Sequence, residues 1–224
     1  LVIGSPGVQS PKFYVLAKPI TGWNSTIVPE IITGPQSEFG IDILLHGEYL
    51  YVSADNDDSG NGIYVYKSQG SSYQYLAKLS VSSPFGSIGY FGRSLTATDD
   101  MVASMGGVSL PGDAGGYRLF IFKKDGEWTD ATETINTKLP IDEVPLRFPF
   151  PIVFISPTEL AASILLKEGD SYTGKVLLTK AFDNTWQQLT GNGLYEQRNL
   201  ASNSDFALNM VWNGSELIRS VEPK

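Results

Sequence analysis

The most constraining feature of this sequence is a short pattern of β-prone segments that recurs along the chain. In each copy a lysine closes an apolar run, and an aromatic residue follows it five or six positions later. Neighbouring copies lie roughly 50–60 residues apart, which is the length of four short strands with their turns. The pairs are Lys18 with Trp23, Lys67 with Tyr73, Lys123 with Trp128, and Lys180 with Trp186. We expect each lysine at a hairpin end and each aromatic side chain packed against the next unit.

Each copy is expected to contain four strands, of which the second and third form a hairpin. Glycine, aspartate and proline separate the apolar runs, as strands and turns require. A first strand beginning with phenylalanine precedes each hairpin, at Phe39, Phe91, Phe150 and Phe206, and in the third copy it is expected over residues 91–97. The predicted hairpins pair residues 1–5 with 13–16, 50–53 with 63–66, 101–104 with 119–122, and 160–163 with 176–179. The apolar periodicity of helices is absent.

This repeat predicts an all-β fold in a single domain, a β-propeller of four-stranded antiparallel blades. The expected units are residues 1–36, 37–88, 89–145, 146–203 and 204–224. Two arrangements stay open at this point. Either the last unit completes the first blade and closes a ring of four blades, or the chain is a fragment of a larger ring. A start within a strand-like segment favours the larger ring.

The residues of the predicted first and second strands resemble the FG-GAP repeat. Phe39-Gly40 and Phe91-Gly92 begin short apolar strands, and second strands end in Gly4-Ser5-Pro6 or Ser53-Ala54-Asp55. The FG-GAP repeat builds the propeller of integrin α-subunits. The resemblance therefore implies about seven blades, an extracellular or cell-surface location, and a protein ligand on the loop face. The family often carries a calcium loop between the first two strands, but here those connections are two-residue turns, too short to surround calcium.

The composition excludes several classes of partner and site. A formal net charge of -8 and a pI of about 4.6 argue against nucleic acid, whose phosphates need clustered lysine and arginine. The absence of cysteine excludes disulfides, thiolate metal sites and a cysteine nucleophile. No apolar run approaches the roughly 18–20 residues of a membrane helix, and residues 148–155 are interrupted by Pro149 and Pro151. We expect neither nucleic-acid binding nor membrane insertion.

No set of catalytic residues is visible, so the chain is predicted not to be an enzyme. His46 is the one histidine, and a Ser-His-Asp triad or a histidine–metal site would need it. Adjacent carboxylates occur at 57–58, 99–100 and 142–143, but neighbours on a strand point to opposite faces, and carboxylates in turns are solvated. Two alternatives stay open: a propeller-type glycan hydrolase with catalytic residues on several blades, and a structural segment of a large exported assembly.

The most polar stretch is residues 55–62, which begins like a calcium loop of the Asp-x-Asp-x-Ser-Gly type. Asp55, Asp57 and Asp58 supply three carboxylates, but Ile63 stands where the terminal acidic ligand is expected. Three interpretations stay open: a solvated hairpin loop, a weak calcium site at the three aspartates, or a contact with a partner. No other cofactor is expected.

The loops between second and third strands would gather on one face of a propeller. A rigid scaffold that displays variable loops is a common way to build a binding surface. We therefore predict a binding or adhesion module that recognises a protein or glycan there, with other segments of a larger propeller or assembly as further partners. The acidic loops would suit a cationic or polyhydroxyl ligand. The loops are residues 5–11, 53–62, 105–116 and 167–174, and the candidate partner-binding residues are Asp55, Asp57, Asp58, Asp113, Glu168, Asp170 and Tyr172.

Overall fold

The computed structural model describes residues 1–5, 11–16, 22–23, 27–34, 39–55, 61–81, 87–89, 91–109, 116–138, 151–168, 171–182, 185–188, 195–200, 210–212 and 217–219. Every regular element in this part of the chain is a β-strand, and every strand pairing is antiparallel. The all-β prediction is confirmed. These residues include no helix with the length and apolar character to cross a membrane.

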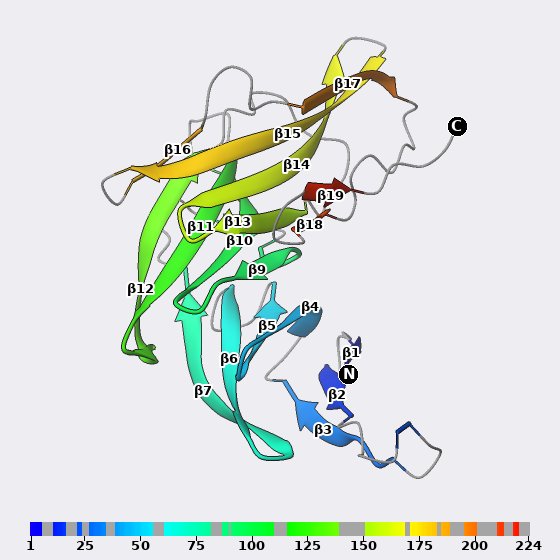
Figure 1. Ribbon diagram of the computed structural model, residues 1–224, viewed down its shortest axis with the longest axis vertical. Helices are drawn as coiled ribbons and strands as arrows, with labels where there is room; N and C mark the ends of the chain where they lie inside the picture. Colours follow the sequence, from blue (N-terminus) through cyan, green and yellow to red (C-terminus); the bar gives the residue numbers. More distant parts are fainter. Residues whose placement is uncertain are drawn as a thin grey trace.

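The strands form five sheets in chain order (Figure 1). The first sheet contains β1 (Val2–Ser5), β2 (Lys12–Val15) and β3 (Glu30–Thr33). The second contains β4 (Phe39–His46), β5 (Tyr49–Ala54), β6 (Gly62–Gln69) and β7 (Ser72–Ser80). The third contains β8 (Ser87–Gly89), β9 (Leu95–Ala97), β10 (Met101–Ser109), β11 (Gly116–Asp125) and β12 (Glu127–Lys138). The fourth contains β13 (Ile152–Ser156), β14 (Glu159–Glu168), β15 (Ser171–Phe182), β16 (Thr185–Gln188) and β17 (Tyr195–Leu200), and the fifth contains β18 (Met210–Trp212) and β19 (Leu217–Arg219).

Consecutive sheets lie next to one another along an open arc, so that the first and the last sheet both lie at the right of Figure 1. The first strands are neighbours in the order β4, β9, β13 and β18, and the fourth strands β7, β12 and β16 are neighbours as well. The described strands form no closed ring. The order of the sheets in space is therefore the same as their order in the sequence, as expected for a repeat.

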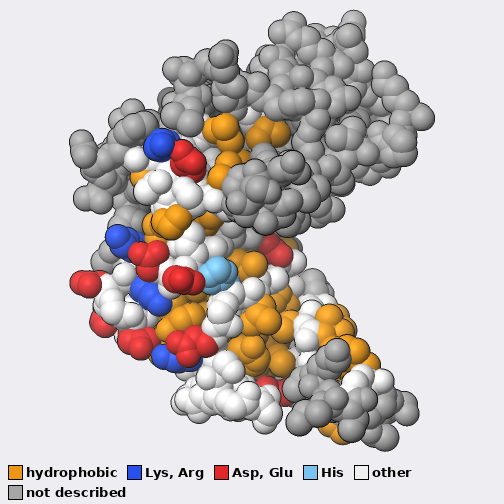
Figure 2. All heavy atoms as spheres, in the orientation of Figure 1, with side chains coloured by type: hydrophobic (Ala, Val, Ile, Leu, Met, Phe, Trp, Pro, Cys, Tyr) orange, Lys and Arg blue, Asp and Glu red, His pale blue; other side chains and the backbone are white. Residues whose placement is uncertain are grey.

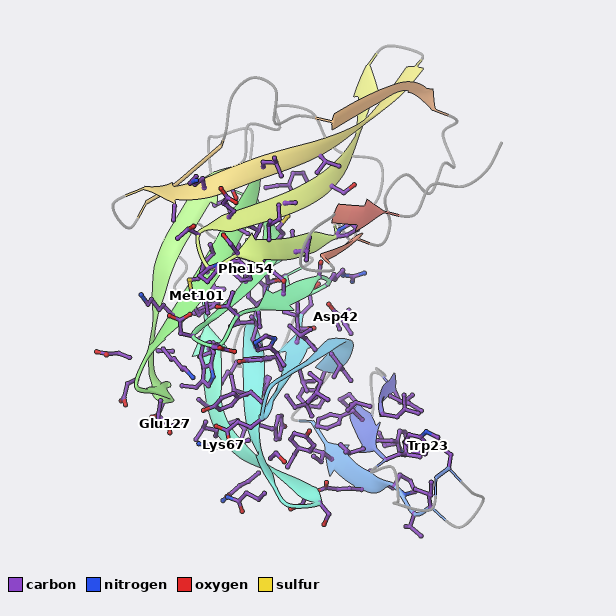
Figure 3. All side chains as sticks on the ribbon, viewed as in Figure 1. Trp23, Asp42, Lys67, Met101, Glu127 and Phe154 are labelled. Atoms are coloured by element: carbon purple, nitrogen blue, oxygen red, sulfur yellow. The ribbon has the colours of Figure 1, made fainter. Side chains whose placement is uncertain are left out.

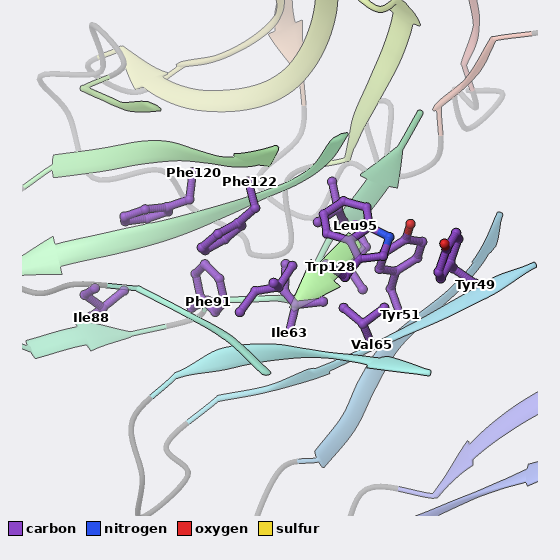
Figure 4. Packing of buried hydrophobic residues seen from close by; sticks show 12 residues of the cluster. Tyr49, Tyr51, Ile63, Val65, Ile88, Phe91, Leu95, Phe120, Phe122 and Trp128 are labelled. Atoms are coloured by element: carbon purple, nitrogen blue, oxygen red, sulfur yellow. The ribbon is translucent and has the colours of Figure 1, made fainter. Parts of the chain in front are cut away.

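Alternating side chains explain the stacking, because successive residues of a strand point to opposite faces. All six residues of β5 are buried. Leu50 and Val52 pack with the first sheet, whereas Tyr49 and Tyr51 pack with the third. Each central sheet therefore has two apolar faces, and the chain buries both only by placing a sheet on each side. Figure 4 shows the cluster between the second and third sheets, with Trp128 against the tyrosines.

The Phe-Gly pairs mark a close approach between neighbouring sheets. Phe39 and Phe91 are fully buried, and the glycine after each has a positive φ, +83° at Gly40 and +79° at Gly92. A Cβ on Gly92 would lie 2.4 Å from the Cβ of Ser53, in the second sheet. Glycine is needed here both for the left-handed backbone and for the missing side chain.

A hydrogen bond two residues after each of these glycines joins the first strands. Asp42 Oδ2 accepts from the N–H of Leu95 (2.7 Å), and Ser94 Oγ accepts from the N–H of Ile152 (3.0 Å). Equivalent side chains in the second and third sheets therefore each accept a hydrogen bond from the first strand of the following sheet.

The strands differ from the prediction in three places. In the third sheet residues 91–94 form turns and bends, so β9 covers only Leu95–Ala97 of the strand expected over 91–97. Phe150 and Phe206 lie outside the described residues, and β13 begins at Ile152. Two strands were not foreseen: β8 adds to the far end of β10, and β17 pairs with β15.

The recurrent aromatic residues occupy equivalent places, but the predicted direction of packing was wrong. Tyr73, Trp128 and Trp186 are each the second residue of a fourth strand. Trp128, from the third sheet, packs on Tyr49 and Tyr51 of the second, which is the preceding unit rather than the next. Trp23 precedes β3 and is half-exposed. Three of the lysines lie where expected, because Lys67, Lys123 and Lys180 each pair with the first residue of a second strand.

Candidate functional site

The predicted binding loops leave the sheets at one edge, which we call the loop edge, where each second strand connects to the third. In the second sheet Asp55 and Asn61 flank this connection. The side chain of Asp55 is only 1% exposed, and its Oδ2 lies 3.6 Å from Nε of Arg93. Asn61 donates through Nδ2 to the carbonyl of Ile88. Because Arg93 and Ile88 belong to the third sheet, both ends of this connection are attached to the neighbouring sheet.

The position of Arg93 bears on the calcium hypothesis for Asp55, Asp57 and Asp58. A guanidinium beside the Asp55 carboxylate competes with a metal ion for the same oxygens. The described residues contain no group of three or more histidine, aspartate or glutamate side chains placed to hold a metal. Asp57 and Asp58 lie outside the described residues, so their calcium and partner-binding roles stay predictions.

The loop edge of the fourth sheet is a paired hairpin rather than the loop that we predicted over residues 167–174. β14 and β15 remain paired as far as Glu168 and Ser171, and Tyr172 pairs with Lys167. Glu168 and Tyr172 therefore lie together near the tip of one hairpin, which projects beyond the body of the sheets in Figure 1. Asp113 and Asp170 lie outside the described residues. In the third sheet, part of the loop expected over 105–116 is likewise strand, because β10 runs to Ser109.

The opposite edge, which we call the turn edge, carries His46. Its Nε2 lies 3.1 Å from Oδ1 of Asp99, in the equivalent turn of the third sheet, and Asp99 is fully exposed. Among the described residues, Asp99 is the hydrogen-bond partner of the His46 side chain. The turn edge therefore holds a histidine beside a carboxylate, two of the groups of a Ser-His-Asp triad.

A charged cluster that the sequence did not reveal lies beside His46 at the turn edge. Lys67 Nζ is 3.5 Å from a carboxylate oxygen of Glu48 and 3.4 Å from one of Glu127, and Figure 3 shows Lys67 and Glu127 close together. Lys124 Nζ lies 4.9 Å from the centre of the Tyr49 ring. Burial, and then the carboxylate of Glu127, raise the pKa of Tyr49. The cluster covers the rim of the apolar contact between the second and third sheets.

Asp42 is a largely buried acidic residue on β4, the first strand of the second sheet. Burial raises the pKa of its carboxyl group, and the hydrogen bonds donated by Leu95 and Ile43 only partly oppose this. Sequence reasoning missed Asp42, because an alternating strand does not reveal which polar side chain meets a neighbouring sheet. The signal that could have found it is its place two residues after a Phe-Gly pair, shared with Ser94.

A comparison of the chain with models of known protein families finds no match, and a comparison with curated proteins finds none either.

Proposed function

We propose that the chain is part of an FG-GAP-like β-propeller that works as a binding or adhesion module, extracellular or at the cell surface. Neighbouring blades of a propeller place equivalent strands side by side around an axis. The succession of first strands, β4, β9, β13 and β18, supports this arrangement. The loop edge would then carry the recognition surface for a protein or glycan.

The observation that carries the binding role is the attachment of both ends of residues 55–61 to the third sheet. Asp55 faces Arg93, and Asn61 donates to the carbonyl of Ile88. A binding loop fixed at its base loses less conformational entropy when a ligand binds. The acidic residues between these anchors, Asp57 and Asp58, are then the candidates for ligand contact, and Asp55 serves to fix the loop.

Charge reversal tests this role. We expect a glycan array or immobilised polylysine to retain the protein, and the double variant Asp57→Lys, Asp58→Lys to weaken that binding at least about tenfold. Asp99→Lys is the matched control, because Asp99 is fully exposed but lies at the turn edge. Equal loss in the control and the loop variant, or no retention on any probe, would contradict the proposal.

Calcium is tested separately from ligand binding. Because Arg93 neutralises Asp55, we expect about 1–5 mM calcium chloride, the range of weak extracellular sites, to leave the melting temperature unchanged. Differential scanning calorimetry with and without the salt measures this. A rise in melting temperature that disappears in Asp57→Asn would instead assign a calcium site to this loop.

The hydrolase alternative has its own readout. Chromogenic glycosides incubated with the protein should show no turnover above buffer, because we propose a binding module and the sequence shows no combined acid, base and nucleophile. Turnover that co-purifies with the protein through two chromatographic steps would replace the binding proposal with an enzymatic one.

A further inference from the structure

The contact between the first and second sheets ends at its outer rim in an exposed aromatic ring. Tyr75, on β7, is 53% exposed, although it shares a face of the second sheet with Tyr64 and Tyr66, which are 7% and 5% exposed. The first sheet covers this face, and Phe13 of β2 meets Tyr66 edge to face, with ring centroids 5.4 Å apart. Because β7 is the outermost strand of the second sheet, the Tyr75 ring remains in solvent with both sheets in place.

The ring of Tyr75 is held from behind by two buried rings. Its centroid lies 5.8 Å from that of Tyr66, edge to face, and 6.2 Å from that of Tyr64. A tyrosine fixed in this way offers a rigid, amphipathic contact surface and loses little side-chain entropy when a ligand stacks on it. Tyr75 therefore has the properties of a stacking platform.

A carboxylate of the first sheet faces the same rim. Glu30 of β3 pairs with Val15, which is buried against the second sheet, so the Glu30 side chain lies on that face as well. Its Oε2 is buried and has no hydrogen-bond partner among the described residues. Burial, and then the carboxylate of Glu30, raise the pKa of Tyr73, which precedes Tyr75 by two residues on β7. A buried acceptor without a donor is costly, and a ligand hydroxyl would satisfy it.

A hydrogen-bond donor lies on the other side of the platform along β7. Lys78 pairs with Tyr64 across the two strands, and its Nζ lies 5.3 Å from the centre of the Tyr64 ring. Lys78 disfavours a cationic ligand and Glu30 an anionic one, because like charges repel. The adjacent hairpin tip is uncharged: residues 68–77 contain no acidic or basic side chain, and the tip is white at the bottom of Figure 2. The rim therefore suits a neutral ligand that both donates and accepts hydrogen bonds.

We propose that this rim binds a neutral glycan, with one pyranose ring stacked on Tyr75. The C–H face of a pyranose is apolar and can cover an aromatic ring, while its hydroxyl groups donate to Glu30 and accept from Lys78. Tyr73 and Tyr75 are roughly 7 Å apart along the strand, so one or two sugar units span from the platform to the residue beside Glu30. The site is distinct from the loop edge and does not depend on the recognition proposed there.

Titration with neutral sugars is the first test. Glucose, galactose, mannose and N-acetylglucosamine, each up to about 100 mM, reveal dissociation constants in the millimolar range by saturation-transfer NMR or calorimetry. We expect at least one of them to bind, and Tyr75→Ala to weaken that binding at least about tenfold. Tyr75→Phe should retain it, because the ring and not the hydroxyl group makes the contact.

The matched aromatic control is Tyr14→Ala. Tyr14 lies between Phe13 and Val15 on β2, so its side chain is on the opposite face of the first sheet, and its loss should leave sugar binding intact. Absence of binding of all four sugars to the wild-type protein would overturn the proposal. Equal losses in Tyr75→Phe and Tyr75→Ala, at equal melting temperatures, would overturn the stacking role of the ring.

The second test concerns the polar contact and the class of ligand. Glu30→Gln keeps the size of the side chain but removes the charged acceptor, so we expect sugar affinity to fall at least about threefold. Tetramethylammonium chloride is the second probe: binding of this cation in place of the sugars, abolished by Glu30→Gln, would assign a cation site and overturn the choice of a glycan. Sugar binding lost in Asp57→Lys, Asp58→Lys but kept in Tyr75→Ala would place the sugar at the loop edge, which overturns the rim site while supporting the loop-edge function.

Discussion

At the scale of single residues, glycines and polar side chains at the contacts between sheets have roles that the sequence around them does not reveal. Gly92 and Gly126 both have positive φ, +79° and +81°, yet only Gly92 has a neighbour in the way of a Cβ. Asp42 is polar on an apolar strand, and it accepts a hydrogen bond that would otherwise be lost. Substitutions at these positions can therefore distinguish a residue needed for its backbone conformation from one needed for its contact with a neighbouring sheet.

Replacement of Gly92 by alanine is expected to cost more than the same change at Gly126. The positive φ alone costs about 1–2 kcal/mol at either site. At Gly92 the overlap with Ser53 Cβ adds about 1–3 kcal/mol, whereas nothing lies within 4 Å of a Cβ on Gly126. Urea unfolding of the two variants measures the difference. Equal losses would show that the Phe-Gly glycine is required for its backbone conformation alone.

Removal of the Asp42 acceptor should leave the buried N–H of Leu95 without a partner. Asp42→Ala is expected to lower the free energy of unfolding by about 1–3 kcal/mol. Asp42→Ser, which copies the residue at the equivalent place in the next sheet, Ser94, should lose less. Denaturant titration compares them. Equal destabilisation by alanine and serine would contradict the role of the side-chain oxygen.

The stability contribution of Asp42 should also depend on pH. Burial raises its pKa above the usual value of about 3.8, so the folded protein holds the proton more tightly than the unfolded chain. Protonation therefore stabilises the fold: the contribution is complete below about pH 3.8 and is lost as pH rises through the raised pKa. As the pH falls, the wild-type protein should consequently become more stable relative to Asp42→Ser, as measured by the free energy of unfolding. A difference that does not change with pH would contradict it.

At the scale of the elements, the fourth strand of the third sheet attaches that sheet to the second sheet through an aromatic side chain. Trp128 is fully buried and meets Tyr51 and Tyr49 edge to face, with ring centroids 5.4 and 6.2 Å apart. The period of lysine and aromatic residues located this strand correctly. It could not give the packing direction, because both faces of a sheet in a stack are apolar.

Truncation of this anchor should strongly destabilise the protein. Trp128→Ala is expected to cost about 3–5 kcal/mol, because it opens a cavity between the second and third sheets. Trp23→Ala is the control: Trp23 is 51% exposed, and its loss should change stability by less than about 0.5 kcal/mol. Chemical denaturation followed by circular dichroism measures both. Similar effects of the two changes would refute the assignment of Trp128 as an anchor.

At the scale of the whole molecule, the first four sheets share buried clusters, so none of these four can unfold without exposing apolar side chains of a neighbouring sheet. One cluster joins the first and second sheets, another the second and third, and a third the third and fourth. Stability in such a stack resembles a sum of units and interfaces. We expect a single urea transition in which tryptophan fluorescence and circular dichroism coincide, with Trp128→Ala shifting the midpoint of both signals together. Two separated transitions would show that the interfaces couple the sheets weakly.

The sequence by itself determined the all-β class and the hairpins of second and third strands, because alternation and turn chemistry are local properties. Phe39 correctly marked the first residue of β4. Only the tertiary structure decided which side chains meet: that Asp55 lies buried beside Arg93, that Asp42 supports Leu95, and that Ile3 remains exposed. These facts depend on which face of one sheet covers the next, and a strand with two apolar faces does not encode that choice in its own residues.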